Sequence, residues 1–202
     1  MITKLLLILS IILTIICYLN IIIKKQNKNK DLQETAANTV TNLTKEDNSL
    51  HLVENKNGLV NKYLIKRKMI KLTTNTYYSK NPLNVSIAYL FSGYSKLNVP
   101  KLNFIGKIIP YIYYVSFIPL ISIALSLILN SPFDAKIGLV VLIIFAIYQY
   151  IINITTIDAI NKVTIKEDII KKYLKELVLL NNVLLISTIL QVIRFALIIL
   201  ER

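Results

Sequence analysis

The stretch LLLILSIILTIICYLNIII, residues 5 to 23, decides what kind of protein this is. Its 19 residues carry no charge and lie between Lys4 and Lys24. At about 1.5 Å per residue, a helix of this length extends roughly 29 Å, close to the ~30 Å hydrocarbon thickness of a bilayer. A cleavable signal peptide is the competing interpretation, but this run is too long and no small-residue cleavage site follows it. We therefore expect an uncleaved N-terminal transmembrane anchor over residues 1–23.

Three further apolar stretches have the length of a membrane span. They cover Ile108 to Leu129, Ile137 to Ile152 with an extension through Asn153 and Ile154, and Leu177 to Leu200. The short turn SPFD, residues 131 to 134, would join the first two of these into an antiparallel hairpin. We therefore predict a transmembrane hairpin over 108–154, a cytoplasmic loop over 155–176 and a C-terminal transmembrane helix over 177–202.

The distribution of charge predicts how the chain lies in the membrane. The sequence has 24 Lys and Arg against 11 Asp and Glu, a net charge of +13. Residues 24–107 hold 15 of the basic residues and residues 161–176 hold five more. By the positive-inside rule both segments are cytoplasmic and both termini lie outside. No basic patch interleaved with aromatic residues indicates nucleic acid, so we expect the lipid bilayer to be the partner of this charge.

The cytoplasmic region, residues 24–107, has an order of its own. The patterns predict a helix over Glu34 to Leu43, strands over Leu50 to Val53, Leu59 to Ile65 and Met69 to Thr73, and a first turn at Asn55 to Gly58. A further helix is predicted over 82–97, with Asn81 as its cap and Pro82 at its first position. The expected fold is a mainly α membrane protein with four transmembrane helices and a small cytoplasmic α+β insertion between the first and second.

The predicted helix at 82–97 carries an apolar stripe at helical spacing. Its members are Leu83, Ile87, Leu90, Phe91 and Tyr94. We interpret the stripe as packed core, because aliphatic and aromatic residues at this spacing usually fill a core. The alternative interpretation is a binding groove on the same face.

Several stretches in one order carry a resemblance to a known family. They are GLVNKYLIKRKMIKLTTNTYY at 58 to 78, the helix up to Gly93 and Ser95, ITTIDAINK at 154 to 162, and ILQVIRFALII at 189 to 199. The chain resembles a small bacterial family of membrane-embedded neutral zinc metallopeptidases, with an N-terminal anchor, a cytoplasmic HEVGH helix, a membrane hairpin and a final span. The most specific pieces are the Tyr77, Tyr78 pair and Gln191 with Arg194. The resemblance covers most of the chain at low identity and implies a multi-pass protein of the bacterial plasma membrane.

The resemblance places the family's zinc motif on residues that lack its chemistry. Leu90 and Tyr94 stand at the two His positions, Phe91 at the Glu position, and only Gly93 is retained. Zinc hydrolysis needs two imidazoles at i and i+4 and a carboxylate base beside the first. In ITTID, Thr156 falls where the family has a Glu, while Asp158 keeps a second carboxylate; which of the two positions supplies the third ligand stays open. We expect no catalytic residue, no metal site and no cofactor.

Two other kinds of site were weighed against the sequence. His51, the only histidine, has Glu46, Asp47 and Glu54 as neighbours, a set more typical of a solvated surface than of a zinc site. The serines of the 82–97 helix, namely Ser86, Ser92 and Ser95, lack a histidine base nearby in the sequence, so we expect capping or polar-face roles for them. Cys17, the single cysteine, excludes a disulfide within one chain.

The polar residues of the last span point to helix packing. Asn181, Asn182 and Gln191 are predicted to form hydrogen bonds between helices. Arg194 lies about 10 Å from the chain end along the helix, so we expect it to snorkel to the membrane surface.

Together these observations predict a catalytically inactive pseudopeptidase that acts as an interaction or structural module in the membrane. Its partner would be a second membrane protein or an unfolded polypeptide. The alternative is a membrane-bound zinc metallopeptidase with a non-standard site, and that alternative alone would require zinc.

Overall fold

The computed structural model describes residues 2–26, 31–58, 61–97, 121, 124 and 132–200, and these fall into two compact units. The first unit comprises most of α1 (Ile2–Gln26), α7 (Pro132–Asn161) up to Asn153, and α8 (Asp168–Leu200) from Leu179. The second unit comprises the described residues of 26–113 and residues 154–178. The predicted span over Ile108 to Leu129 lies outside the described residues, apart from two isolated positions.

Three helices are long and apolar enough to cross a membrane: Ile2–Asn20, Lys136–Asn161 and Asp168–Leu200. This confirms the mainly helical fold with membrane spans, and three of the four predicted spans lie on these helices. α7 begins at Pro132, inside the predicted turn, and the predicted loop over 155–176 is helical except at 162–167. The helices extend into this segment because polar residues mark where a span meets water, whereas a helix continues as long as its inner face is buried. Ile170 and Leu174 bury that face in α8. That the segment is a cytoplasmic loop stays a prediction.

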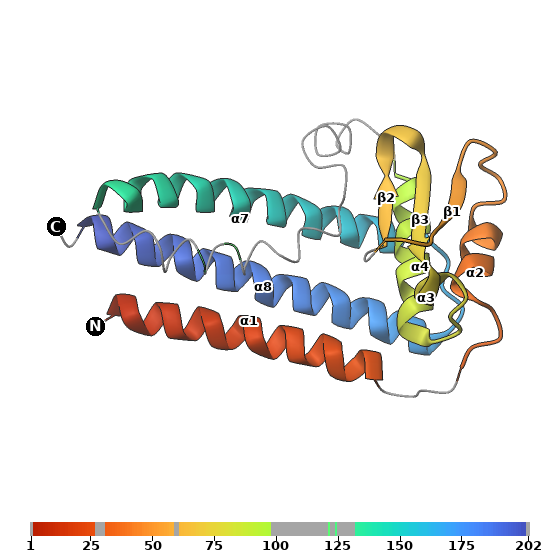
Figure 1. Ribbon diagram of the computed structural model, residues 1–202, viewed down its shortest axis with the longest axis horizontal. Helices are drawn as coiled ribbons and strands as arrows, with labels where there is room; N and C mark the ends of the chain where they lie inside the picture. The colour runs from red at the N-terminus through yellow and green to blue at the C-terminus, as the bar shows by residue number, and fades with distance from the viewer. Residues whose placement is uncertain are drawn as a thin grey trace. The chain divides into compact units, whose positions relative to one another are not determined.

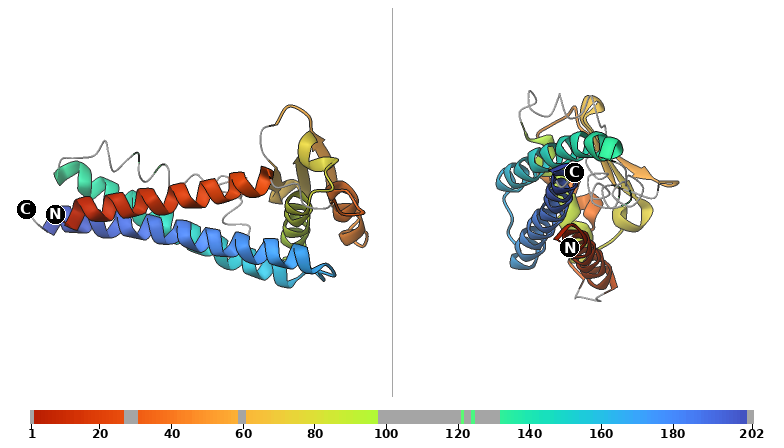
Figure 2. Two further views of the ribbon diagram at one scale, coloured as in Figure 1. Left: turned by 90° about the horizontal axis from the view of Figure 1, so that it is seen from below. Right: turned by 90° about the vertical axis from the view of Figure 1, so that its left-hand side faces the viewer.

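In the first unit, α8 lies between α1 and α7, and it runs in the opposite direction to both (Figure 1; Figure 2, right). Polar side chains join α1 to α8. Thr14 Oγ1 and Ser187 Oγ are 2.8 Å apart, Ser187 Oγ donates to the Ser10 carbonyl at 2.9 Å, and Gln191 Nε2 donates to Ser10 Oγ. All four side chains are buried. In an apolar surrounding such pairs fix which helix faces meet, so the predicted interhelical role of Gln191 is confirmed.

A second set of polar contacts joins α7 to α8. Thr188 Oγ1 donates to Gln149 Oε1 at 3.0 Å, and Asn153 Nδ2 donates to Asn182 Oδ1 at 3.1 Å, which confirms the predicted role of Asn182. Arg194 differs from its prediction, because it is only 8% exposed and its guanidinium carbon lies 5.4 Å from the ring centroid of Phe195. The side chain stays buried beside the ring of Phe195, whereas we predicted that it would extend to the membrane surface.

The second unit is built on a three-stranded sheet of β1 (His51–Asn55), β2 (Lys62–Leu64) and β3 (Met69–Thr73), in the order β1-β3-β2 (Figure 1). β1 pairs with β3 in parallel and β2 pairs with β3 antiparallel. The predicted turn at 55–58 forms, with Gly58 N donating to Asn55 O at 3.2 Å, but the strands it separates are not neighbours. β3 takes the centre because its Ile70 and Leu72 are fully buried.

Short helices complete the second unit. α2 (Ala36–Leu43) packs against α4 (Pro82–Ser95), the turn of η1 (Ile65–Arg67) precedes β3, and α3 (Thr74–Tyr77) follows it. α4 begins as predicted, since Asn81 Oδ1 accepts a hydrogen bond from Leu83 N at 2.9 Å and Pro82 opens the first turn.

Candidate functional site

The site that the resemblance predicts lies within the second unit, where α4 meets the last turns of α7. Tyr94 Oη and Thr156 Oγ1 are 2.6 Å apart, and each side chain is only 2% exposed. These two residues are 62 positions apart in the sequence, and they occupy the places where the resemblance expects a zinc-ligating His and a Glu. The structure therefore brings two of the four predicted positions into direct contact.

The other two positions are apolar and buried beside this pair. Leu90 is 8% exposed and Phe91 is 3% exposed. The rings of Phe91 and Tyr94 are tilted against each other with centroids 6.4 Å apart. Leu83 and Ile87, the remaining members of the predicted stripe, are only half-buried. The end of the stripe that carries the predicted motif positions is thus its most buried part, which favours packed core over an open groove.

Gly93 explains how closely α4 approaches α7. A Cβ atom at this position would lie 2.7 Å from the carbonyl carbon of Ala159 and 3.0 Å from Val163 Cγ2, and it would also meet the Ala159 carbonyl oxygen. Because real Cβ contacts are rarely so short, a larger residue would push the helices apart. The glycine therefore sets the distance that allows Tyr94 to reach Thr156.

The donor set at this place does not fit zinc. Leu90 and Phe91 have no lone pair to offer, and the hydroxyls of Tyr94 and Thr156 are hydrogen-bonded to each other. Asp158, the retained carboxylate, is exposed. A catalytic zinc site normally takes three protein ligands such as imidazole or carboxylate in fixed geometry. Within the described ranges, no group of three or more His, Cys, Asp or Glu side chains is placed to hold a metal ion.

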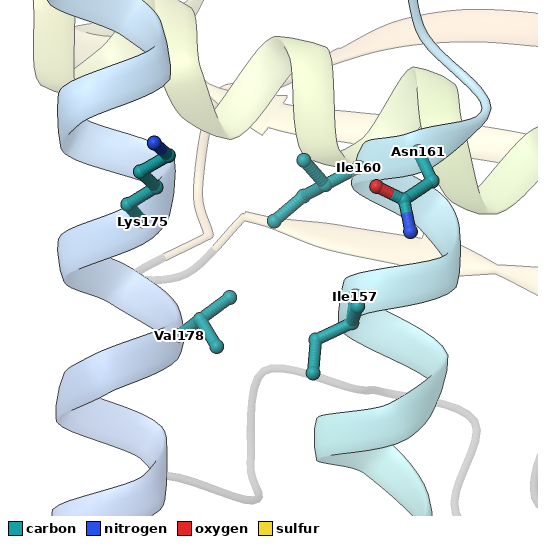
Figure 3. A pocket seen from close by; sticks show the side chains of 5 residues that line it. All are labelled: Ile157, Ile160, Asn161, Lys175 and Val178. Atoms are coloured by element: carbon teal, nitrogen blue, oxygen red, sulfur yellow. The ribbon is translucent and has the colours of Figure 1, made fainter.

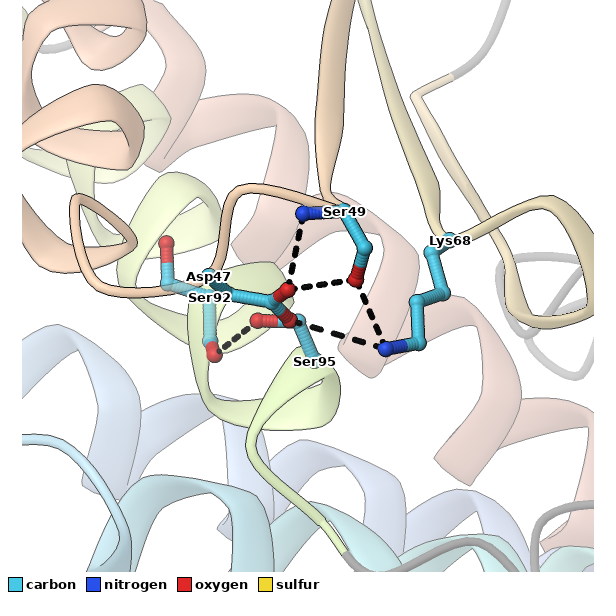
Figure 4. Close-up of polar contacts among 5 residues, drawn as sticks. All are labelled: Asp47, Ser49, Lys68, Ser92 and Ser95. Carbon is cyan, nitrogen blue, oxygen red and sulfur yellow. Dashed lines mark hydrogen bonds and ion pairs between the residues drawn. The ribbon is translucent and has the colours of Figure 1, made fainter.

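The carboxylates near His51 have other contacts. Asp47 accepts hydrogen bonds from Ser49 and lies 3.9 Å from Lys68 Nζ, which in turn donates to Ser49 Oγ at 2.7 Å (Figure 4). The Ser49 hydrogen bonds hold the pKa of Asp47 below its usual value. This cluster ties the chain before β1 to the turn before β3. Figure 4 also places Ser92 and Ser95 on the nearby helix.

Glu54 anchors the tyrosine pair that carries part of the resemblance. It accepts hydrogen bonds from Thr74 Oγ1 at 2.8 Å and from Tyr78 Oη at 3.2 Å. The hydrogen bond to Glu54 raises the pKa of Tyr78. The Tyr77 and Tyr78 rings meet edge to face at 4.9 Å. These contacts connect β1 with α3, so the pair has a structural part in this unit.

The serines of α4 are bound to their own helix. Ser86 Oγ donates to Pro82 O at 2.7 Å and Ser92 Oγ donates to Ala88 O at 2.9 Å, and both side chains are buried. Ser95 Oγ donates to Ser92 O at 2.7 Å. Roles in capping or on a polar face, which we predicted, are therefore wrong for Ser86 and Ser92, whose hydroxyls are satisfied inside the fold.

Sequence analysis missed one structural residue of this unit, Asn61. Its amide is 7% exposed, donates to Thr76 Oγ1 at 3.0 Å and accepts from Thr73 N at 2.7 Å. It thereby fixes the corner between β3 and α3. The signal available in the sequence was a single asparagine on the buried face of an otherwise apolar strand.

We compared the chain with models of known families, with curated proteins and with solved structures, and none of the three comparisons gave a match. The resemblance to the metallopeptidase family therefore stands on the quoted stretches alone.

Proposed function

We propose that this protein is a multi-pass protein of the bacterial plasma membrane, built like the membrane-embedded zinc metallopeptidases but catalytically inactive. It acts as an interaction or structural module of the membrane. Its cytoplasmic unit would contact a partner membrane protein or an unfolded polypeptide.

The hydrogen bond between Tyr94 and Thr156 is the observation that carries this proposal. A hydrolytic site needs a water molecule and a carboxylate base next to the metal. Here two hydroxyls 2.6 Å apart are hydrogen-bonded to each other, and Leu90 and Phe91 are buried beside them. Because function must be argued from the site and not from the fold, this arrangement favours a packing role over hydrolysis.

The arrangement of the first unit supports four spans. α1 and α7 run in the same direction, so the chain leaves α1 at one end of the unit and enters α7 at the other (Figure 1). A further crossing between them would return the chain, and the apolar run from Ile108 to Leu129 has the length for it. The start of α1 and the end of α8 lie at the same end of the unit, which supports placing both termini on one side. By the positive-inside rule that side is outside.

Zinc content and proteolysis test the inactive site. We expect the purified protein to contain far less than one zinc per chain and to leave a flexible peptide intact. The matched comparison is the quadruple variant Leu90→His, Phe91→Glu, Tyr94→His and Thr156→Glu, which restores every motif position of the family pattern. Stoichiometric zinc in the wild-type protein that survives mild chelation would contradict the proposal.

Reporter fusions test the arrangement in the membrane. Fusions after Lys45 and after Glu167 should report the cytoplasm, and a C-terminal fusion should report the outside, because 20 of the 24 basic residues lie in the two segments assigned to the cytoplasm. A C-terminal reporter found in the cytoplasm would indicate an odd number of spans and would refute the proposed topology.

A further inference from the structure

A groove opens in the second unit between the last turns of α7 and the part of α8 that lies alongside them (Figure 3). It has a volume of about 340 Å³, at the lower end of the range for small-molecule sites. Its lining consists of Ile157, Ile160, Asn161, Lys175 and Val178. None of these residues belongs to the predicted zinc motif, so the groove is separate from the question of hydrolysis.

The groove is polar at one end and apolar at the other. On α7, Ile157 comes before Asn161, which is the last residue of the helix. On α8, which runs back alongside α7, Lys175 comes before Val178. The two polar side chains therefore lie at the end of the groove nearer the connection between the helices, and Ile157 and Val178 lie at its other end, as Figure 3 shows. This order, a charged head followed by an apolar tail, is the order of groups in a phospholipid.

The groove also lies at the depth where a phospholipid head group is found. The predicted spans end at Ile154 on α7 and begin at Leu177 on α8, so Ile157 lies about 5 Å and Lys175 about 3 Å beyond them along the helices. Head groups occupy roughly the outer 5 to 7 Å on each side of the hydrocarbon core. Ile157 remains 41% exposed on this surface, and Lys175 and Asn161 are also exposed. With the spans as predicted, the opening would face the boundary between lipid and water.

Lys175 decides which kind of lipid fits. It is the charged residue of the lining, and it is cationic. An ammonium attracts a phosphate as a point charge, and an amide such as that of Asn161 can donate a hydrogen bond to the same group. Lys172 adds positive charge to the same stretch of α8, whereas Lys171 is paired with Asp168 at 3.4 Å. The negative surface of a cytoplasmic leaflet strengthens this attraction.

We propose that the groove binds one anionic phospholipid, with the phosphate at Lys175 and Asn161 and the start of an acyl chain between Ile157 and Val178. The site would tie the cytoplasmic end of α7 and α8 to the charge of the bilayer. It depends on insertion in the membrane but not on the loss of catalysis, so either proposal can fail without the other.

Native mass spectrometry of the full chain in mild detergent tests this site, with phosphatidylglycerol and phosphatidylcholine of the same chain length as probes. The wild-type protein should retain one phosphatidylglycerol in preference to phosphatidylcholine. Lys175→Ala should lower the retained phosphatidylglycerol about fivefold, the effect of one lysine near a lipid surface. Lys172→Ala is the matched control, because Lys172 is exposed on the same helix but does not line the groove, and it should change retention little.

Four results would overturn the proposal. Equal losses in Lys175→Ala and Lys172→Ala would indicate general surface charge, and equal retention of the two lipids would remove the role of charge. Competition by inorganic phosphate as effective as by phosphatidylglycerol would show a site for free phosphate and not for a lipid. Val178→Trp, which fills the groove, should also reduce the retention of phosphatidylglycerol. If that variant folds, retains the lipid and changes the oligomeric state instead, the groove binds a second copy of the chain. The Lys175 and Lys172 pair decides the outcome even if Val178→Trp does not fold, because both lysines are exposed.

Discussion

Replacing Gly93 by alanine tests the packing of α4 on α7, because two physical effects predict opposite signs. Within a helix, alanine is favoured over glycine by about 1 kcal/mol. If Gly93 lay on an open face, Gly93→Ala would therefore stabilise the protein. In the structure its Cβ would lie 2.7 Å from the Ala159 carbonyl carbon and 3.0 Å from Val163 Cγ2. The neighbour that it meets first is backbone, which cannot rotate away.

The cost of this overlap exceeds the gain in helix propensity. Overpacking a buried position typically costs about 1 to 3 kcal/mol, and a fixed main-chain neighbour places Gly93→Ala toward the upper end. After the gain of about 1 kcal/mol, we expect a net loss of about 1 to 2 kcal/mol. For a chain of this size that corresponds to a melting temperature lower by about 2 to 8 °C.

Thermal unfolding in detergent measures the change in melting temperature. It can be followed by a method that does not need tryptophan, such as circular dichroism at 222 nm. Gly58→Ala is the matched control, because the neighbour of its added Cβ is the side chain of Asn55, which can move aside. We expect that control to change the melting temperature by less than Gly93→Ala does. A Gly93→Ala protein that melts at or above the wild-type temperature would refute the close contact of α4 with α7, and with it the closed site.

Three more predictions follow from the second unit. Phe91→Ala should lower the free energy of unfolding by about 3 to 5 kcal/mol, as is typical of buried aromatic deletions. Ile87→Ala, at a half-buried position of the same helix, should lower it by less. Equal effects of the two variants in thermal unfolding would contradict the packed core. Burial raises the pKa of Tyr63 to about 12 from 10, with the charge of Asp47 adding to the shift. The contribution of the neutral Tyr63 to stability is therefore complete below pH 10 and is lost as the pH rises to 12, by up to about 3 kcal/mol. Tyr63→Phe should lack this alkaline loss of stability in denaturant titrations, and an unchanged pH dependence would contradict the burial. Chelation with EDTA should leave the melting temperature unchanged, because the residues at the predicted motif positions, 90, 91, 94 and 156, do not provide a zinc-ligand set. A lower melting temperature on chelation would indicate a structural metal.

Local signals in the sequence predicted α4 well, whereas the pairing of strands depended on contacts far apart in the chain. Asn81 and Pro82 mark the start of α4 because capping acts within a few residues. The order β1-β3-β2 could not be read in the same way. It follows from the burial of Ile70 and Leu72, which depends on what covers the sheet. A turn at 55–58 predicts a change of direction, but it does not determine which strand becomes the neighbour.

The ends of the long helices show a second limit of the sequence. Composition located three candidate spans among the described residues, because lipid accepts only long apolar runs. It did not give the ends of the helices, since α8 begins at Asp168, on an amphipathic pattern that lies outside the apolar run. For the candidate site, the resemblance predicted that residues near 90 and 156 meet, whereas the residues alone gave no reason to join Tyr94 to Thr156.

The four positions of the predicted zinc motif depend on one another physically. Two histidines and two carboxylates in so buried a place would be costly without a metal, because buried ionisable groups need partners. Replacing only one of them would leave the others without their ligand set. In this chain none of the four positions carries an ionisable zinc ligand of that kind: Tyr94 and Thr156 carry hydroxyls hydrogen-bonded to each other, and Leu90 and Phe91 carry apolar side chains that need no partner. Meanwhile Gly93 still permits the close approach of α4 to Ala159. The contact between the two helices can therefore be kept by packing and one hydrogen bond, in the place where the resemblance expects a metal to hold it.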